Sequence, residues 1–144
     1  MISYAGENSY QRIIPLAASA VVVGNGYVCT DTNGNLNAAS DTSGFVFCGS
    51  SAQDVSNATG AAGAQIAMVN DFSLMPRYQK IATTGLTRAA VGAMSYFTNT
   101  AGAASAVGLA ASSSNKVAAG RIVDFVSSTF VVIDTWDRFT LATA

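Results

Sequence analysis

The chain has 144 residues, of which 50% are hydrophobic and only 10% are charged, whereas an average soluble domain has about 25% charged residues. Seven Lys and Arg against eight Asp and Glu give a formal net charge of −1, and the chain contains no His. This balance argues against a nucleic-acid-binding surface, which needs a basic patch, and against intrinsic disorder. The length predicts one compact domain. The low charge indicates either a large Ala content or a subunit that buries part of its surface against neighbours.

The first fifteen residues show no clean strand or helix periodicity. Pro15 favours extended geometry in the residue before it. We therefore expect an N-terminal arm over residues 1–15 and a single β domain over residues 16–144. Such an arm is either a frayed terminus or a segment that becomes ordered on a partner, and its Tyr, Ile and Arg content suits an interface.

Short β-branched or aromatic runs separated by Gly, Asn, Asp and Ser predict an all-β fold, a small β-barrel or β-sandwich, with at most one or two short helices. A short helix is considered only near residues 103–112. Tight turns are expected at residues 24–26, where they would join the first two strands, and at 31–35 and 127–128. The expected strands are 18–23, 27–30, 45–49, 65–69, 94–98, 117–126 and 129–134.

The two halves of the domain resemble each other, over residues 16–70 and 85–135. A run of apolar residues ends at Gly24 in the first half and at Gly92 in the second. A later strand carries Gly49 in the first half and Gly120 in the second. The hypothesis is that two similar halves pair into one small barrel or sandwich, and chance similarity in an Ala- and Gly-rich chain is the alternative.

No pattern of residues predicts an active site. Asp31, Asn33 and Asn35 have the spacing of the first ligands of an EF-hand, but the Gly and the Glu that the loop requires are absent, so a turn is expected. Cys29 and Cys48 are expected to be buried free thiols rather than a disulfide. Without a His to activate a nucleophile, the sequence predicts no enzyme, no cofactor and no metal site. No apolar run approaches the roughly 18 residues of a membrane span.

The Gly and β-branched positions resemble those of a known family. The pattern comprises Tyr27-Val28, the run from Phe45 to Gly49, Tyr96-Phe97, Gly120-Arg121 and the closing strand from Phe130 to Ile133. Over residues 16–134 it is similar to small bacteriophage head proteins, the capsid decoration or cement proteins encoded beside the major capsid protein. The resemblance implies a virion protein, made in the host cytoplasm, that binds the outer capsid surface and stabilises the shell. It further implies a homotrimer, with a dimer as the alternative.

Partner contacts are expected to involve the major capsid protein and other copies of this chain, but neither nucleic acid nor a membrane. A tail-tube or head–tail connector subunit is the alternative function, followed by a receptor- or glycan-binding module. Aromatic, apolar and Arg residues suit such interfaces. The candidate interface residues are Tyr4, Tyr10, Arg12, Ile13, Ile14, Phe72, Met75, Arg77, Tyr78, Trp136, Arg138 and Phe139.

Overall fold

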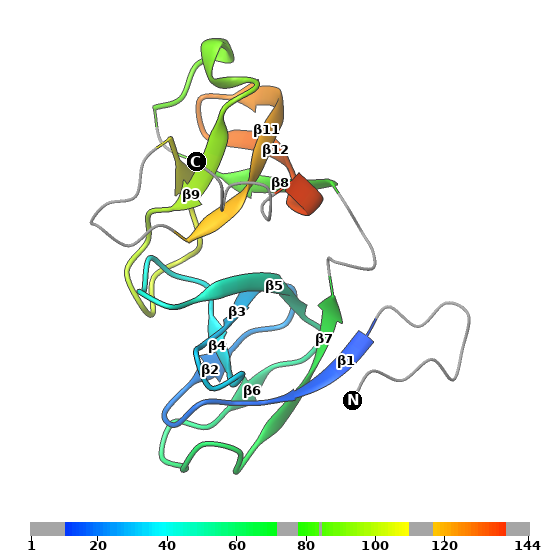
Figure 1. Cartoon of the computed structure of the whole chain (residues 1–144), viewed down its shortest axis with the longest axis vertical. Helices are drawn as coiled ribbons and strands as arrows, with labels where there is room; N and C mark the ends of the chain where they lie inside the picture. Colours follow the sequence, from blue (N-terminus) through cyan, green and yellow to red (C-terminus); the bar gives the residue numbers. More distant parts are fainter. Residues whose placement is uncertain (1–10, 72–77, 84, 110–116, 138–144) are drawn as a thin grey trace. The chain divides into compact units, whose positions relative to one another are not determined.

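The computed structural model describes residues 11–71, 78–83, 85–109 and 117–137, and it divides the chain into two units. Unit 1 comprises Met1–Ala39 and Phe45–Met75, and unit 2 comprises Ser40–Gly44 and Pro76–Ala144. Each unit contains one five-stranded antiparallel sheet (Figure 1). The prediction of an all-β fold with at most short helices is confirmed, because helical structure in the described part is confined to 3-10 turns at Arg88–Ala90 (η1) and residues 135–137.

The sheet of unit 1 has the order β1-β7-β5-β3-β4. Its strands are β1 (Gln11–Pro15), β3 (Tyr27–Thr30), β4 (Leu36–Ala38), β5 (Val46–Ser51) and β7 (Ile66–Asp71). Leu16, which directly follows the edge strand β1, forms a parallel bridge with Leu36 in the other edge strand, β4. The sheet therefore curls on itself, which leaves less of its edges open. A two-stranded ribbon of β2 (Val21–Val22) and β6 (Val55–Ser56) completes this unit.

The sheet of unit 2 has the order β10-β9-β11-β12-β8. Its strands are β8 (Tyr78–Ala82), β9 (Met94–Phe97), β10 (Val107–Gly108), β11 (Ala118–Ser127) and β12 (Phe130–Asp134). As in unit 1, the residue after one edge strand pairs with the other edge strand. Thr83, which directly follows β8, forms a parallel bridge with Val107 in β10. The Thr83 hydroxyl supports the bridge by donating to the Val107 carbonyl over 2.6 Å.

The two sheets therefore have the same topology, with β1, β7, β5, β3 and β4 corresponding to β8, β12, β11, β9 and β10. Backbone hydrogen bonds repeat between them. Asn25 N–H donates to the Ser51 carbonyl over 2.7 Å, and Gly92 N–H donates to the Ile122 carbonyl over 2.8 Å. Likewise Leu16 donates to Gln65 and Thr83 donates to Thr129, each over 2.9 Å.

Of the two glycine pairs predicted from the sequence, the structure confirms one and changes the other. Gly49 does correspond to Gly120, since a Cβ at either position would overlap a carbonyl oxygen of the neighbouring strand, that of Asn70 or of Asp134. However, Gly92 corresponds to Asn25 rather than to Gly24, because both have positive φ, 97° and 66°. Each half forms its own five-stranded sheet, and the pairing of the two halves into one barrel or sandwich stays a prediction.

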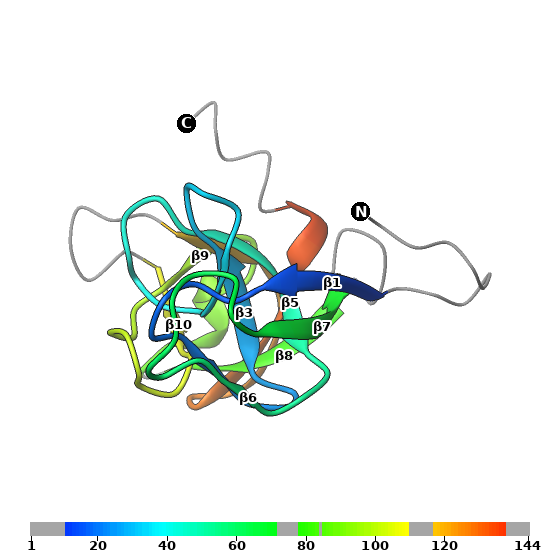
Figure 2. The ribbon, with the colours of Figure 1, turned by 90° about the horizontal axis from the view of Figure 1, so that it is seen from below.

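Several expected boundaries were wrong. Gln11–Pro15 belongs to the sheet rather than to an N-terminal arm, because it pairs with β7 along its whole length (Figures 1 and 2). Only Val21–Val22 of the expected strand 18–23 forms a strand, and Ser19 takes a positive φ of 63° in the turn before it. This strand pairs with β6 rather than forming a hairpin with β3. Strands β4, β6, β8 and β10 were not expected, and the described part of 103–112 contains β10 and no helix.

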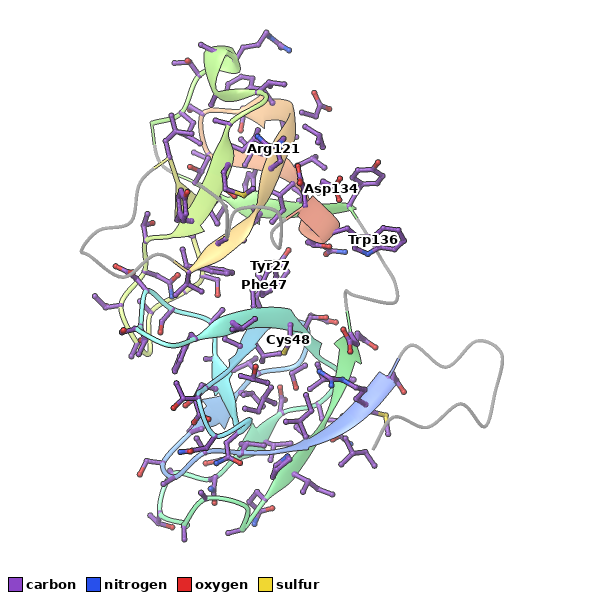
Figure 3. The ribbon with its side chains drawn as sticks, viewed as in Figure 1. Tyr27, Phe47, Cys48, Arg121, Asp134 and Trp136 are labelled. Atoms are coloured by element: carbon purple, nitrogen blue, oxygen red, sulfur yellow. The ribbon has the colours of Figure 1, made fainter. Side chains whose placement is uncertain are left out.

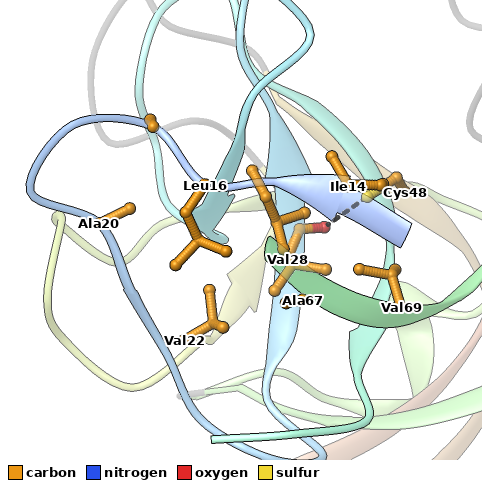
Figure 4. Packing of buried hydrophobic residues seen from close by; sticks show 10 residues of the cluster. Ile14, Leu16, Ala20, Val22, Val28, Cys48, Ala67 and Val69 are labelled. Carbon is orange, nitrogen blue, oxygen red and sulfur yellow. Dashed lines mark hydrogen bonds between the residues drawn. The ribbon is translucent and has the colours of Figure 1, made fainter. Parts of the chain in front are cut away.

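Apolar side chains fill the interior of each curled sheet. In unit 1, Ile14, Leu16, Val22, Val28 and Val69 pack together with small residues and with Cys48, whose Sγ donates to the Val28 carbonyl (Figure 4). Cys29 and Cys48 are buried thiols that are not joined in a disulfide, as predicted. The buried apolar residues of unit 2 include Ile81, Met94, Phe97, Val107, Ile122, Val131 and Ile133.

Candidate functional site

The candidate interface residues fall into four groups in the structure, the last of which is Arg12 alone. Tyr4, Tyr10, Phe72, Met75, Arg77, Arg138 and Phe139 lie outside the described residues. Ile14 is buried in the core of unit 1, so its assignment to an interface was wrong. The alternation of side chains along β1 explains this, because Ile13 and Ile14 point to opposite faces of the sheet. Ile13, Tyr78 and Trp136 have exposed fractions of 54%, 54% and 40%.

Arg12 is used within unit 1. Its Nε lies 2.7 Å from Oδ2 of Asp71, a residue that is buried. A buried carboxylate needs such a partner, because burial removes the water that would otherwise stabilise its charge. The pair joins β1 to the end of β7, so Arg12 has a structural role that the sequence did not indicate.

The corresponding strand pairs β1–β7 and β8–β12 present exposed apolar side chains on their outer faces. In unit 1 these are Ile13 and Ile66, with exposed fractions of 54% and 55%. In unit 2 the position of Ile66 is taken by Phe130, which is 39% exposed, and Lys80 Nζ lies 4.7 Å from the centre of its ring. We call the two surfaces the outer face of unit 1 (Gln11, Ile13, Pro15, Ile66, Met68) and the outer face of unit 2 (Tyr78, Lys80, Ala82, Phe130, Val132).

These outer faces were found only in part from the sequence. Ile13 and Tyr78 are among the predicted interface residues, whereas Ile66 and Phe130 belong only to predicted strands. Alternation within each strand could have found them, since Ile66 and Met68 share one side of β7 while Ala67 and Val69 are buried on the other.

The C-terminal part of unit 2 carries its own polar network. Arg121 bonds to Asp137 and donates from Nη1 to the Gly92 carbonyl over 2.9 Å. Asp134 is buried, and its Oδ1 accepts the backbone N–H of Trp136 over 3.1 Å (Figure 3). These contacts hold the residues after β12 against the sheet.

Within the residues that the structure describes, no group of three or more His, Cys, Asp or Glu side chains could hold a metal ion. The predicted turn at 31–35 is confirmed, because Oδ1 of Asp31 accepts the N–H groups of Asn33 and Asn35 over 2.9 and 3.0 Å. None of the described helical turns is long and apolar enough to span a membrane.

Burial shifts the pKa of a Tyr side chain in unit 1. Tyr27 stacks edge-on against Phe47, with ring centres 5.7 Å apart, and burial raises the pKa of the Tyr27 phenol (Figure 3). The phenol therefore keeps its proton to a higher pH than an exposed Tyr does.

Comparison of the chain with known proteins identifies no relative: no family model, no curated protein and no solved structure matches it.

Proposed function

We propose that this protein is a non-enzymatic component of a bacteriophage virion, which binds the outer surface of the capsid and stabilises the shell. The proposal combines the resemblance of residues 16–134 to decoration proteins with one structural observation. That observation is the presence of exposed apolar outer faces at equivalent positions of two units with the same topology.

A capsid repeats the same subunit many times, so a chain with two equivalent units can contact two neighbouring subunits at once. Once the first unit is bound, the second meets its site at an effective concentration of about millimolar for a short connection. Two modest contacts then give tight binding. By linking neighbouring subunits, the chain resists their separation.

The exposed Ile, Tyr and Phe side chains of the outer faces provide the apolar area for these contacts. Apolar contacts of this kind are not weakened by salt, whereas exposed ion pairs are screened by it. Binding to the shell should therefore change little between low and high ionic strength. The partners in this proposal are the major capsid protein and further copies of the chain, as a homotrimer or a dimer.

The test is co-sedimentation of the purified protein with undecorated shells assembled from the major capsid protein of the same genome. The variants are Ile66→Asp in unit 1, Phe130→Asp in unit 2 and the double variant. Val46→Asp serves as the matched control, because Val46 is 50% exposed and lies on β5, outside both outer faces.

We expect each single variant to bind more weakly, the double variant to stay in the supernatant, and the control to bind like the wild type. Binding of the double variant at wild-type occupancy would refute the proposal. Electron microscopy of the wild-type assembly separates the alternatives: knobs on a shell support a decoration protein, stacked rings a tail-tube or connector subunit, and fibre tips a receptor-binding module.

A further inference from the structure

The edge strand β1 of unit 1 has backbone groups that point away from its sheet (Figure 1). Leu16 N–H donates to the Gln65 carbonyl over 2.9 Å, in the register in which β1 pairs with β7. Because the hydrogen bonds of an antiparallel strand alternate between its two sides, Ile14 also bonds to β7, whereas Gln11 and Ile13 direct their N–H and C=O groups outwards. Among the described strands, none pairs with β1 on this outer side.

The curling of the sheet occupies only one end of this edge. The bridge between Leu16 and Leu36 brings β4 next to the end of β1, so the open part of the edge comprises residues 11–13. The side chain of Gln11 donates from Nε2 to Oδ1 of Asn70 over 3.0 Å, which directs it towards β7 rather than across the open edge. Ile13 is 54% exposed. A further strand can therefore reach the backbone of residues 11–13.

The equivalent edge of unit 2 carries a charge that the edge of unit 1 lacks. Strand β8 corresponds to β1, and Lys80 takes the position of Ile13. A Lys on an edge strand opposes pairing with another chain, because its charge would have to leave water or meet a like charge. Arg12 provides no such protection in unit 1, since it lies on the other side of the strand and its Nε lies 2.7 Å from Oδ2 of Asp71. Of the two equivalent edges, that of unit 1 is the one suited to a further strand.

We infer that two copies of this protein form a dimer in which their β1 strands pair antiparallel about a two-fold axis. The axis passes between the two Arg12 residues, so Gln11 of each copy lies opposite Ile13 of the other. Each of these residues then donates one hydrogen bond and accepts one, and every outward backbone group of residues 11–13 in both copies is satisfied. The charges nearest the axis are the Arg12–Asp71 pairs, each of which is neutral as a whole, so repulsion does not oppose the pairing.

A second copy is the partner that this edge favours. Pairing with a copy removes two open edges at once, whereas an unrelated extended segment would cover one and leave the edge of every other copy open. Strands that pair through their edges keep their faces exposed, so the dimer carries the outer faces of both copies of unit 1 on one continuous sheet. The inference does not depend on the proposed capsid role, because the dimer forms from the protein alone.

Sedimentation velocity of the full-length protein over a concentration series tests the inference without capsids. Ile13→Pro removes an outward N–H and leaves the bonds to β7 in place, since Pro is tolerated on an edge strand where the N–H faces solvent. The dissociation constant should rise about tenfold, because each copy loses one donor at the interface. Ile13→Lys introduces the charge that unit 2 has at this position and should weaken the dimer to a similar extent, with partial recovery at high salt. Ile13→Val is the matched control and should dimerise like the wild type.

Hydrogen exchange locates the interface. The amides of Gln11 and Ile13 should be protected at high protein concentration and exchange quickly in dilute solution, whereas that of Ile14, which bonds to β7, should be protected in both. Thermal melting shows whether each variant keeps its fold, and Ile13→Lys decides the test if Ile13→Pro unfolds. A wild-type protein that stays monomeric or forms trimers, a dimer in which Gln11 and Ile13 stay unprotected, or an Ile13→Lys variant that dimerises normally would each overturn the inference.

Discussion

Units 1 and 2 share a strand order, a pattern of backbone hydrogen bonds and a glycine at the same close approach of two strands, but few of their side chains agree. Arg12 and Asp71 form an ion pair in unit 1, and the corresponding positions of unit 2 hold Gln79 and Thr135. Tyr27 corresponds to Met94. The two units therefore share the positions at which the backbone needs a glycine or a hydrogen bond, whereas their buried and exposed side chains differ.

The largest effect is expected at the shared glycines. Gly49→Ala and Gly120→Ala should each lower the free energy of unfolding by about 3 kcal/mol, because the added Cβ has no room beside a neighbouring carbonyl oxygen. Hydrogen exchange should show the loss of protection mainly in the unit that carries the substitution. Gly34→Ala is the control, with open space around its Cβ and a cost of about 1 kcal/mol from its positive φ. Equal effects at Gly34 and Gly49 would argue against a close approach of the two strands at Gly49.

A smaller effect is expected where the units differ in a buried polar pair. Asp71→Thr should cost about 1–3 kcal/mol, because it leaves the partly buried Arg12 without its carboxylate. Adding Arg12→Gln reproduces the residues of unit 2 at these positions and should recover most of the loss. Urea unfolding measures both. If the double variant is less stable than Asp71→Thr alone, the Gln and Thr of unit 2 cannot replace the Arg12–Asp71 ion pair in unit 1.

The smallest effect concerns alkaline pH. Because burial raises the pKa of Tyr27, the folded state keeps the phenolic proton to a higher pH than the unfolded state does. The stability linked to this proton is fully present below the ordinary Tyr pKa of about 10 and is lost as pH rises through the raised value. Tyr27→Phe should therefore lose less thermal stability than the wild type above about pH 10. Parallel melting curves for the two proteins across that range would contradict this.

Much of the fold could be predicted from local sequence signals. Strand β3 and the turn after it were predicted, as was the terminal hairpin of β11 and β12, because β-branched runs bounded by Gly, Asn and Ser form strands and tight turns on their own. The equivalence of Gly49 and Gly120 was also predicted. Of the candidate interface residues, Ile13, Tyr78 and Trp136 are exposed, as their chemistry suggested.

The sequence by itself thus determined an all-β chain with two related halves, since strands, turns and glycines depend on neighbouring residues. Only the tertiary structure decided which strands pair and which side chains are buried. Gln11–Pro15 became a strand because β7, more than fifty positions later, supplies its hydrogen-bond partners, and this pairing buries Ile14 and brings Arg12 to Asp71. Contacts between residues so far apart in the sequence depend on the closing of the whole sheet, which no local pattern encodes.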